Sequence, residues 1–106
     1  MMPYAEFAKL EMRIGKVLLA ERVHGSEKLL RLEVDLGTER RQLVAGIGRN
    51  YAPEEVAGKR IVVLTNLEPR KIVGLESQGM LLAAWEGSEV VLLTTDKEIK
   101  EGAKVG

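Results

Sequence analysis

The chain has 106 residues, a mass of 11.7 kDa and 45% hydrophobic residues, enough for one domain with its own core. Sixteen lysines and arginines balance sixteen aspartates and glutamates, so any basic surface must be local. The lack of cysteine excludes disulfides and thiolate metal sites, and the longest apolar run, Met80 to Trp85, is far too short to span a bilayer. With no signal-peptide pattern at the start, we expect a single soluble, cytoplasmic domain over residues 1–106 that makes no contact with membranes.

The first half of the chain is predicted to form mainly strands. A short helix at residues 5–10 leads into a strand at 12–20, which Gly15 interrupts as a bulge or a tight bend. Apolar and charged residues then alternate over 30–36, the pattern of a half-buried strand. A short turn connects this strand to the next at 41–47, and the two are expected to form a hairpin.

The strand pattern is broken once, at residues 50–58. Pro53 suits the first position of a helix, the glutamates after it suit the positive end of the helix dipole, and Gly58 suits the position after the last turn. One or two helical turns are therefore predicted there. Further apolar strands are expected at 61–65, 80–85 and 90–94.

Five or six short strands with one small helix between the third and fourth favour a small all-β barrel. The OB-fold, a five-stranded Greek-key barrel, has this order, and small terminal extensions would flank it. A β-sandwich fits less well, because a chain of this length would usually supply about seven strands and no central helix.

Catalytic and metal-binding patterns are incomplete. Residues 46–51 begin like a dinucleotide-binding loop, but Tyr51 occupies the position of the third glycine. Residues 74–79 resemble a nucleophile elbow with one residue too many before the serine. His24 is the only histidine, and its neighbours indicate an exposed turn rather than a catalytic triad. We therefore expect neither an enzyme nor a bound cofactor or metal.

The charged residues suggest a binding surface instead. Three basic doublets, Arg40-Arg41, Lys59-Arg60 and Arg70-Lys71, each lie beside a predicted strand or turn. Such doublets are compatible with an ordinary solvated surface, or with a basic groove like the one that OB-folds use for oligonucleotides.

Residues 66–80 form the least ordinary stretch and are predicted to be a loop of about ten residues, a length more often functional than idle. Their chemistry suits a phosphate–sugar surface. The stretch offers two cations, two side-chain amides, a hydroxyl and one apolar contact: Arg70, Lys71, Asn66, Gln78, Ser77 and Met80. Met80 is equally compatible with core packing at the start of a strand.

Spaced motifs extend through almost the whole chain. They are Phe7-x-x-Leu10-x-x-Arg13-x-Gly15-x-Val17, Lys28-Leu29-Leu30-x-Leu32-x-Val34-Asp35-Leu36-Gly37, Arg41 to Ile47, Asn66-Leu67-x-Pro69-Arg70-Lys71-Ile72-x-Gly74 and Ser77-x-Gly79-Met80-Leu81. Together they resemble the tRNA-binding OB domain found at the C-terminus of methionyl-tRNA synthetases, in free-standing tRNA-binding proteins and in synthetase-associated cofactors. Some relatives are secretion chaperones, which depart from the pattern at Ser-x-Gly-Met; this chain retains it.

The resemblance implies that the domain binds tRNA by shape, as a non-catalytic auxiliary module that raises the tRNA affinity of a methionyl-tRNA synthetase. Duplex RNA is read mainly through phosphates and 2′-hydroxyls, which require cations, amides and hydroxyls. The expected phosphate contacts are Lys28, Arg41, Arg49, Arg70 and Lys71, and the expected hydrogen-bonding or apolar contacts are Asn66, Ser77, Gln78 and Met80. The alternative is a peptide-binding chaperone on the same fold.

The resemblance also implies a homodimer. We expect the interface to include the apolar and mildly acidic tail from Glu86 to Gly106. The other interpretation is that residues 90–94 close the barrel and the last residues pack on their own subunit.

Overall fold

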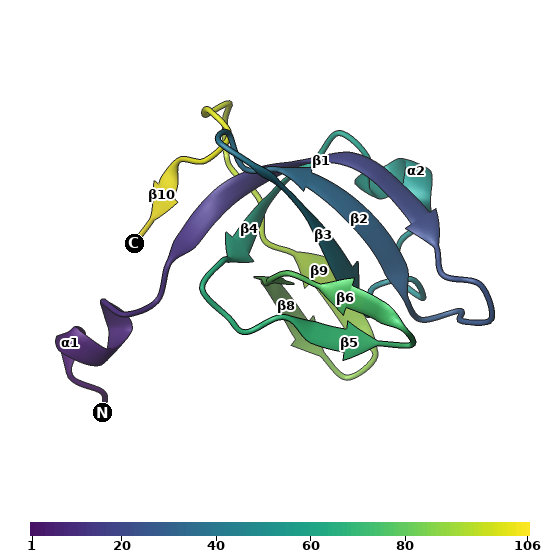
Figure 1. Cartoon of the computed structure of the whole chain (residues 1–106), viewed down its shortest axis with the longest axis horizontal. Coiled ribbons are helices and arrows are strands. Elements are labelled where there is room, and N and C mark those ends of the chain that lie inside the picture. Colours follow the sequence, from purple (N-terminus) through teal and green to yellow (C-terminus); the bar gives the residue numbers. More distant parts are fainter.

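A strongly curved antiparallel sheet forms the body of the molecule, seen in the computed structural model of residues 1–106 (Figure 1). Its strands lie in the order β3-β2-β1-β4-β7, and β10 also pairs with β1. In chain order the elements are α1 (Tyr4–Phe7), β1 (Met12–Arg22), β2 (Leu30–Asp35), β3 (Arg40–Ala45), α2 (Pro53–Val56), β4 (Arg60–Leu64), β5 (Arg70–Ile72), β6 (Leu75–Ser77), β7 (Met80–Leu81), β8 (Ala83–Glu86), β9 (Glu89–Leu92) and β10 (Lys104–Val105).

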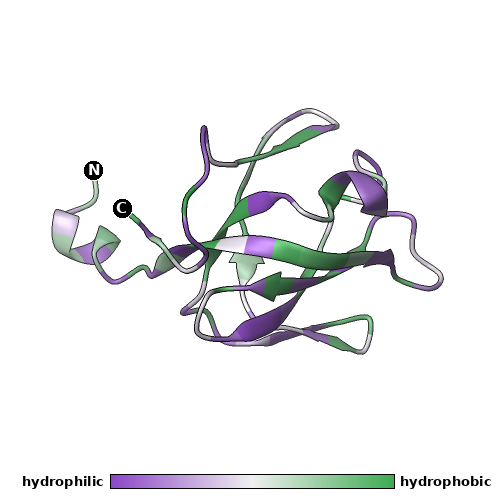
Figure 2. Cartoon of the chain, turned by 90° about the horizontal axis from the view of Figure 1, so that it is seen from above, coloured by the Kyte–Doolittle hydropathy of each residue, from purple (hydrophilic) through white to green (hydrophobic).

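Aliphatic side chains fill the barrel. Alternate residues of β2 are buried, with Leu30, Leu32 and Val34 at 0% exposure, while the charged residues between them lie on the outer face. The same alternation of apolar and polar residues along the strands is visible in Figure 2. One face of each strand is buried in the core. The alternation of apolar and polar residues therefore determines which side chains point into the barrel and which point outward.

The barrel closes where the edge of β3 meets the segment that contains β6 and β7. Here the backbone N–H of Gln78 donates to the carbonyl of Gln42 at 2.8 Å, and the N–H of Gln42 donates to Oε1 of Gln78 at 3.0 Å. The N–H of Val44 donates to Oγ of Ser77 at 3.0 Å. Side chains thus satisfy an edge that would otherwise expose backbone groups.

The predicted fold class is confirmed: the structure is an all-β, nearly closed barrel with a short helix between its third and fourth strands. In α2, Oε1 of Glu55 accepts from the N–H of Ala52 at 2.7 Å, and Val56 is fully buried in the core. The short helix thereby packs into the barrel as well as connecting two strands. Neither helix has the length and the apolar character that a membrane-spanning helix needs.

Three details of the sequence prediction were wrong. Residues 66–80 contain a β-hairpin, β5–β6, rather than a continuous loop. The single strand expected at 80–85 is divided into β7 and β8 around Leu82. The irregularity in β1 falls between Val17 and Leu19, whereas Gly15 lies against Val34, whose side chain occupies the space that a Cβ would need.

Candidate nucleic-acid interface

The cations of this protein divide into those with acidic partners and those without. Ion pairs occupy five of them: Lys9 with Glu6, Arg13 with Glu11, Arg31 with Glu21 and Glu33, Arg41 with Glu39, and Arg60 with Glu101. Several other cations are exposed and have neither an ion pair nor a side-chain hydrogen bond, among them Arg40, Lys59 and the lysines of the C-terminal tail. Four of these unpaired cations are residues that the sequence singled out: Lys28, Arg49, Arg70 and Lys71. These four are free to meet a phosphate without first losing a protein partner.

Two of the free cations, Lys28 and Arg49, line one groove of about 360 Å³. Asn50 and Ser88 add polar groups to its wall, and Val90 adds an apolar one. Asn50 also donates from Nδ2 to the carbonyl of Ser88 at 3.1 Å, which ties the β8–β9 hairpin to the segment after β3. The groove is therefore bounded by segments that are bonded to each other.

Gly48 allows the segments that carry Lys28 and Arg49 to lie close together. A Cβ at Gly46 would stand 2.9 Å from Cε of Lys28, and one at Gly48 would stand 2.7 Å from the carbonyl oxygen of Glu27. The N–H of Gly48 instead donates to the carbonyl of Lys28 at 2.7 Å. Glycine is needed at position 48, because a Cβ there would meet the backbone, whereas the end of the flexible Lys28 side chain could move away from a Cβ at position 46.

Arg22 holds the same two segments from the other side. Its Nη1 donates to the carbonyl of Gly48 at 2.6 Å and to that of Glu27 at 3.2 Å. Sequence reasoning missed Arg22, because its partners are backbone carbonyls that carry no sequence signal. It is a positioning residue for the groove.

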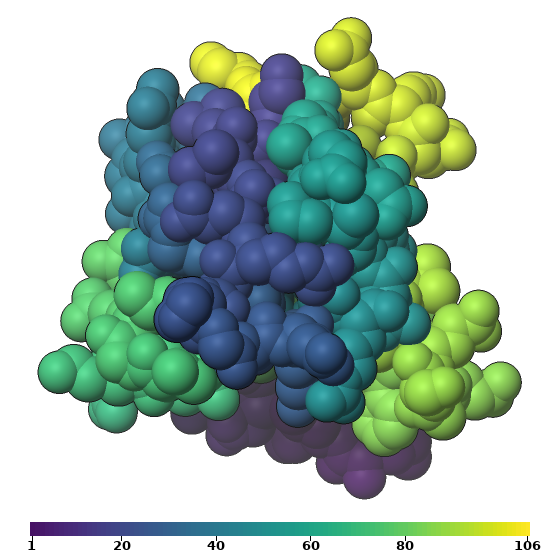
Figure 3. Space-filling view, turned by 90° about the vertical axis from the view of Figure 1, so that its right-hand side faces the viewer, coloured from purple at the N-terminus to yellow at the C-terminus, as the bar shows by residue number.

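The other two free cations lie on the exposed hairpin. Arg70 and Lys71 belong to β5, which pairs with β6 across a two-residue turn. Both turn residues have positive φ, 50° at Val73 and 79° at Gly74, as type I′ turns require. In Figure 3 the β5–β6 hairpin (green) and the β8–β9 hairpin (yellow-green) stand on either side of the β1–β2 loop (dark blue). The hairpin that carries Arg70 and Lys71 and the hairpin that borders the groove thus lie at the same end of the barrel.

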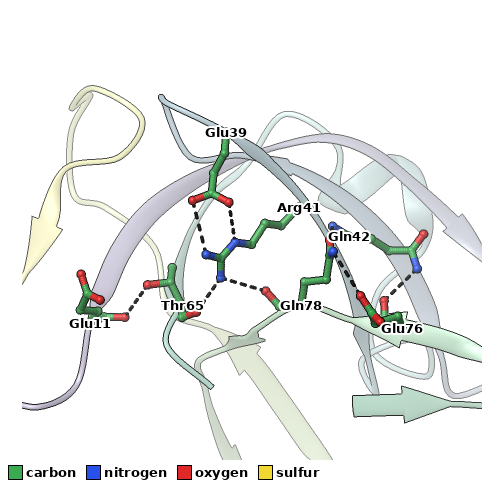
Figure 4. A network of polar contacts seen from close by, with 7 residues as sticks. All are labelled: Glu11, Glu39, Arg41, Gln42, Thr65, Glu76 and Gln78. Atoms are coloured by element: carbon green, nitrogen blue, oxygen red, sulfur yellow. Dashed lines mark hydrogen bonds and ion pairs between the residues drawn. The ribbon is translucent and has the colours of Figure 1, made fainter. Parts of the chain in front are cut away.

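Arg41 was expected to contact phosphate, but its guanidinium is engaged within the protein (Figure 4). Nη1 donates to the carbonyls of Thr65 at 2.5 Å and Gln78 at 3.2 Å, while Nε and Nη2 bond the two carboxylate oxygens of Glu39. The hydrogen bond from Arg41, together with its charge, lowers the pKa of Glu39 below the ordinary value of 4.5. Arg41 therefore joins the ends of the segment that carries the β5–β6 hairpin.

Ser77 and Gln78 support that hairpin. Ser77 is only 2% exposed. Its hydroxyl donates to the carbonyl of Gly79 at 3.0 Å and accepts from the N–H of Val44 in β3. Gln78 bonds Gln42 through side chain and backbone, and Nε2 of Gln42 donates to the carbonyl of Glu76 at 2.8 Å. In this conformation Ser77 has no surface to offer to RNA, so its geometry is that of a positioning residue.

Asn66 and Met80 have different surroundings. Oδ1 of Asn66 accepts from the N–H of Glu11 at 2.9 Å, and Nδ2 donates to the carbonyl of Lys9 at 2.6 Å, so this amide ties the N-terminal segment to the end of β4. Met80 starts β7 and is 39% exposed, so its side chain is divided between the protein and solvent.

The outer face of β2 is electrostatically neutralised. Nε of Arg31 donates to Glu21 at 2.7 Å and Nη2 to Glu33 at 3.2 Å, and the Glu21 bond is the main cause that raises the pKa of Arg31. Nη1 also donates to Oε1 of Gln42 at 3.0 Å. An anion would have to compete with two carboxylates on this face. The end of the barrel is therefore the better candidate for an anion-binding site.

Comparison with known proteins gives the family. Residues 12–104 match the family described as "Putative tRNA binding domain". Methionine–tRNA ligase of Thermotoga maritima is 61% identical over 100 residues, and that of Methanosarcina mazei is 56% identical over 104 residues. The matches cover 94% and 96% of this chain but only 16% and 14% of those enzymes, so the chain corresponds to about one sixth to one seventh of their length.

Two solved structures agree with the whole chain. A MetRS-related protein from Pyrococcus horikoshii is 39% identical with a TM-score of 0.95, over 100% of this chain and 98% of that one. The chaperone CsaA from Bacillus anthracis is 32% identical with a TM-score of 0.93, over 100% and 99% of the two chains. The chain therefore belongs to the tRNA-binding domain family that methionyl-tRNA synthetases carry, a family of non-catalytic binding modules.

Proposed function

We propose that this domain binds tRNA by shape and charge, as an auxiliary module that raises the tRNA affinity of a methionyl-tRNA synthetase. The carrying observation is that four of the exposed cations without acidic partners lie at the end of the barrel that carries the β1–β2 loop, while the outer face of β2 is neutralised. They are Lys28 and Arg49 in one groove and Arg70 and Lys71 on the β5–β6 hairpin. A net charge of zero makes this local concentration the main source of attraction for RNA.

The mode of recognition follows from the chemistry of this end. It presents cations, amides and an exposed hairpin, and no helix of the structure is long enough to read base edges in a groove. Cations fix a phosphate backbone and carry little sequence information. We therefore expect different tRNAs to bind with similar affinity, irrespective of their anticodon.

Salt dependence tests the electrostatic part of this proposal. Because Arg41 is engaged internally, four phosphate contacts replace the five expected from sequence, and log K should fall with log salt at a slope of about −2.8 to −3.6. Fluorescence anisotropy with labelled tRNA between 50 and 300 mM salt, roughly the range over which such contacts weaken, measures it. A flat response, or retention of one tRNA species from a mixed pool, contradicts the proposal.

The auxiliary role needs its own experiment. Gel shifts of tRNA with a methionyl-tRNA synthetase catalytic subunit, with and without this domain, should show tighter binding when both are present. If the affinity of the catalytic subunit for tRNA is unchanged, the auxiliary role is refuted and the domain binds tRNA without assisting a synthetase.

Peptide binding is the second candidate function, favoured by the likeness to CsaA chaperones and by the exposed apolar residues Trp85, Val91 and Leu93. An apolar surface formed by these residues would bind unfolded polypeptide, either in competition with RNA or independently of it. Displacement of labelled tRNA by a reduced, unfolded protein at low micromolar concentration would favour this alternative.

We also propose that the domain works as a homodimer, whose contact surface is the end that carries α1 and β10. No residue of α1 is buried, and Tyr4 and Leu10 are 79% and 43% exposed. Figure 1 shows α1 projecting from the body beside the C-terminus, opposite the β1–β2 loop. Apolar side chains that stay this exposed within their own chain would gain burial from a partner.

The C-terminal tail is largely occupied within its own chain. Glu101 pairs with Arg60 at 2.8 Å, the N–H of Gly102 donates to Ile14 at 2.7 Å, and β10 pairs with the start of β1. Truncation at Asp96 would remove these contacts and weaken the fold itself. Surface substitutions therefore test dimerisation better than truncation does.

Replacing Tyr4 and Leu10 together by aspartate is expected to convert a dimer into a folded monomer, because burying two carboxylates in an interface is unfavourable. Sedimentation velocity at micromolar concentration measures this. Val91→Asp, at a 49% exposed position of β9, is the matched control and should remain dimeric. Loss of the dimer only in Val91→Asp would place the interface on β9, and a monomeric unmodified chain would refute dimerisation.

A further inference from the structure

Trp85 is the most exposed large hydrophobic side chain within the β-sheets, at 76% exposure on β8. It is also the only tryptophan of the chain. Its indole N–H has no hydrogen-bond partner in the protein, and it stacks on no other aromatic ring. A tryptophan this open to water loses the favourable burial of a large apolar surface, so a ligand that covers it would gain that free energy.

The register of the β8–β9 hairpin shows which way Trp85 faces. Trp85 lies directly opposite Val90, and paired residues of antiparallel strands project from the same side. Val90 lines the groove that contains Lys28 and Arg49 and packs against the hydrophobic core. Trp85 therefore stands on the groove side of the hairpin, toward its turn.

The acidic residues of the hairpin lie on the other side. Glu86 and Glu89 form the next pair toward the turn, and because side chains alternate along a strand, they project away from the face of Trp85 and Val90. The aromatic ring is therefore on the side of the hairpin that borders the groove of Lys28 and Arg49, just outside the groove wall, whereas the carboxylates face the other side. This is the combination with which single-stranded nucleic acid is bound: cations for the backbone and an aromatic face for a base.

The hairpin is held in place rather than loosely attached. Asn50 bonds the carbonyl of Ser88 in the turn, and the hydroxyl of Tyr51 accepts from the N–H of Leu92 at 3.1 Å. Leu92 is itself buried in the core. A preformed platform loses little conformational entropy on binding, which favours stacking.

We infer that Trp85 stacks on an unpaired nucleobase of the bound RNA while Lys28 and Arg49 hold the adjacent phosphates. This inference rests on the proposed RNA-binding function and adds to it a contact that requires a base outside the duplex. The domain would then distinguish folded RNA with an unstacked nucleotide from a continuous duplex. The base itself is not specified, because every base has a π-face.

Since Trp85 is the only tryptophan, its fluorescence reports on this contact alone. Titration with tRNA should quench emission and saturate at the same concentration as anisotropy of labelled tRNA. A blunt RNA duplex without unpaired nucleotides should bind through its phosphates and leave emission nearly unchanged. Trp85→Leu, which keeps an apolar side chain but removes the ring, should weaken tRNA binding by about 5- to 150-fold and duplex binding by less than about twofold.

Two further variants serve as controls. Trp85→Phe retains an aromatic face and should recover most of the affinity, while Glu86→Gln with Glu89→Gln changes the other face and should not weaken binding. Circular dichroism verifies folding, which an exposed substitution should leave intact.

The outcomes separate this inference from the function on which it rests. If tRNA does not bind by anisotropy, the proposed function fails and the inference with it. If tRNA binds but emission is unchanged, or Trp85→Leu weakens tRNA and duplex equally, only the stacking is refuted. Emission that changes with protein concentration or with unfolded polypeptide, and not with tRNA, would also overturn it and assign Trp85 to a protein contact.

Discussion

Replacing Arg70 and Lys71 together by glutamate is expected to reduce tRNA affinity by about 100-fold or more. Each side chain is exposed and unpaired, and a hydrogen bond to a charged group contributes about 1.5–3 kcal/mol, so two such contacts would be lost and replaced by repulsion. Anisotropy with labelled tRNA measures the loss.

The choice of variants at Arg70 and Lys71 must take account of Glu76, which lies directly opposite Lys71 in the β5–β6 ladder. Glutamate at 71 would create a like-charge pair there, at a cost of about 1 kcal/mol or less. The glutamine pair Arg70→Gln with Lys71→Gln avoids this repulsion and should still weaken binding. Lys97→Glu with Lys100→Glu makes the same change of net charge on the exposed tail and should affect tRNA far less. Normal affinity in a folded Arg70/Lys71 variant would move the site away from the hairpin.

Arg41→Lys is expected to destabilise the fold and weaken tRNA binding, although it keeps the positive charge. Lysine cannot reproduce the planar fork with which Arg41 bonds Glu39 and the carbonyls of Thr65 and Gln78. Loss of hydrogen bonds from a charged, partly buried group should lower the free energy of unfolding by about 1.5–3 kcal/mol. Chemical denaturation and tRNA anisotropy on the same preparations measure the two effects.

The neighbouring Arg40 provides the matched control, because it is exposed and makes no side-chain hydrogen bond. Arg40→Lys should match the unmodified chain in both measurements. If Arg41→Lys also has the stability and tRNA affinity of the unmodified chain, while Arg41→Ala does not bind tRNA, then Arg41 acts as a simple charge at a phosphate. That is the role that the sequence alone led us to expect. A loss in Arg41→Lys that parallels its loss of stability supports the positioning role.

Local patterns were sufficient to predict most of the barrel. The alternation over residues 30–36 identifies β2, because burial of one face imposes a period of two on any strand. Pro53 and Gly58 delimit α2 through backbone preferences that act within a few residues. The motifs around Arg70 and Ser77 led to the family, which the comparisons confirm.

The β5–β6 hairpin was missed for a physical reason. Its strands have three residues each, and its Val73-Gly74 turn lacks the Asn-Gly or Asp-Gly signal typical of type I′ turns. Bonds from Gln42 and Val44, more than 30 residues away, hold β6 against the barrel. A local pattern cannot report contacts made at such separation.

By itself the sequence determined the barrel, its central helix, the family and the set of basic residues available for RNA. Only the tertiary structure decided which of those residues are free. Lys28 and Arg49 lie unpaired in one groove, where Gly48 admits the close approach of the backbone at Glu27, whereas Arg41 is engaged by carbonyls from residues 65 and 78. A charged residue acts on a ligand only if no nearer partner in the fold satisfies it, and that competition is set by distances between segments remote in the chain.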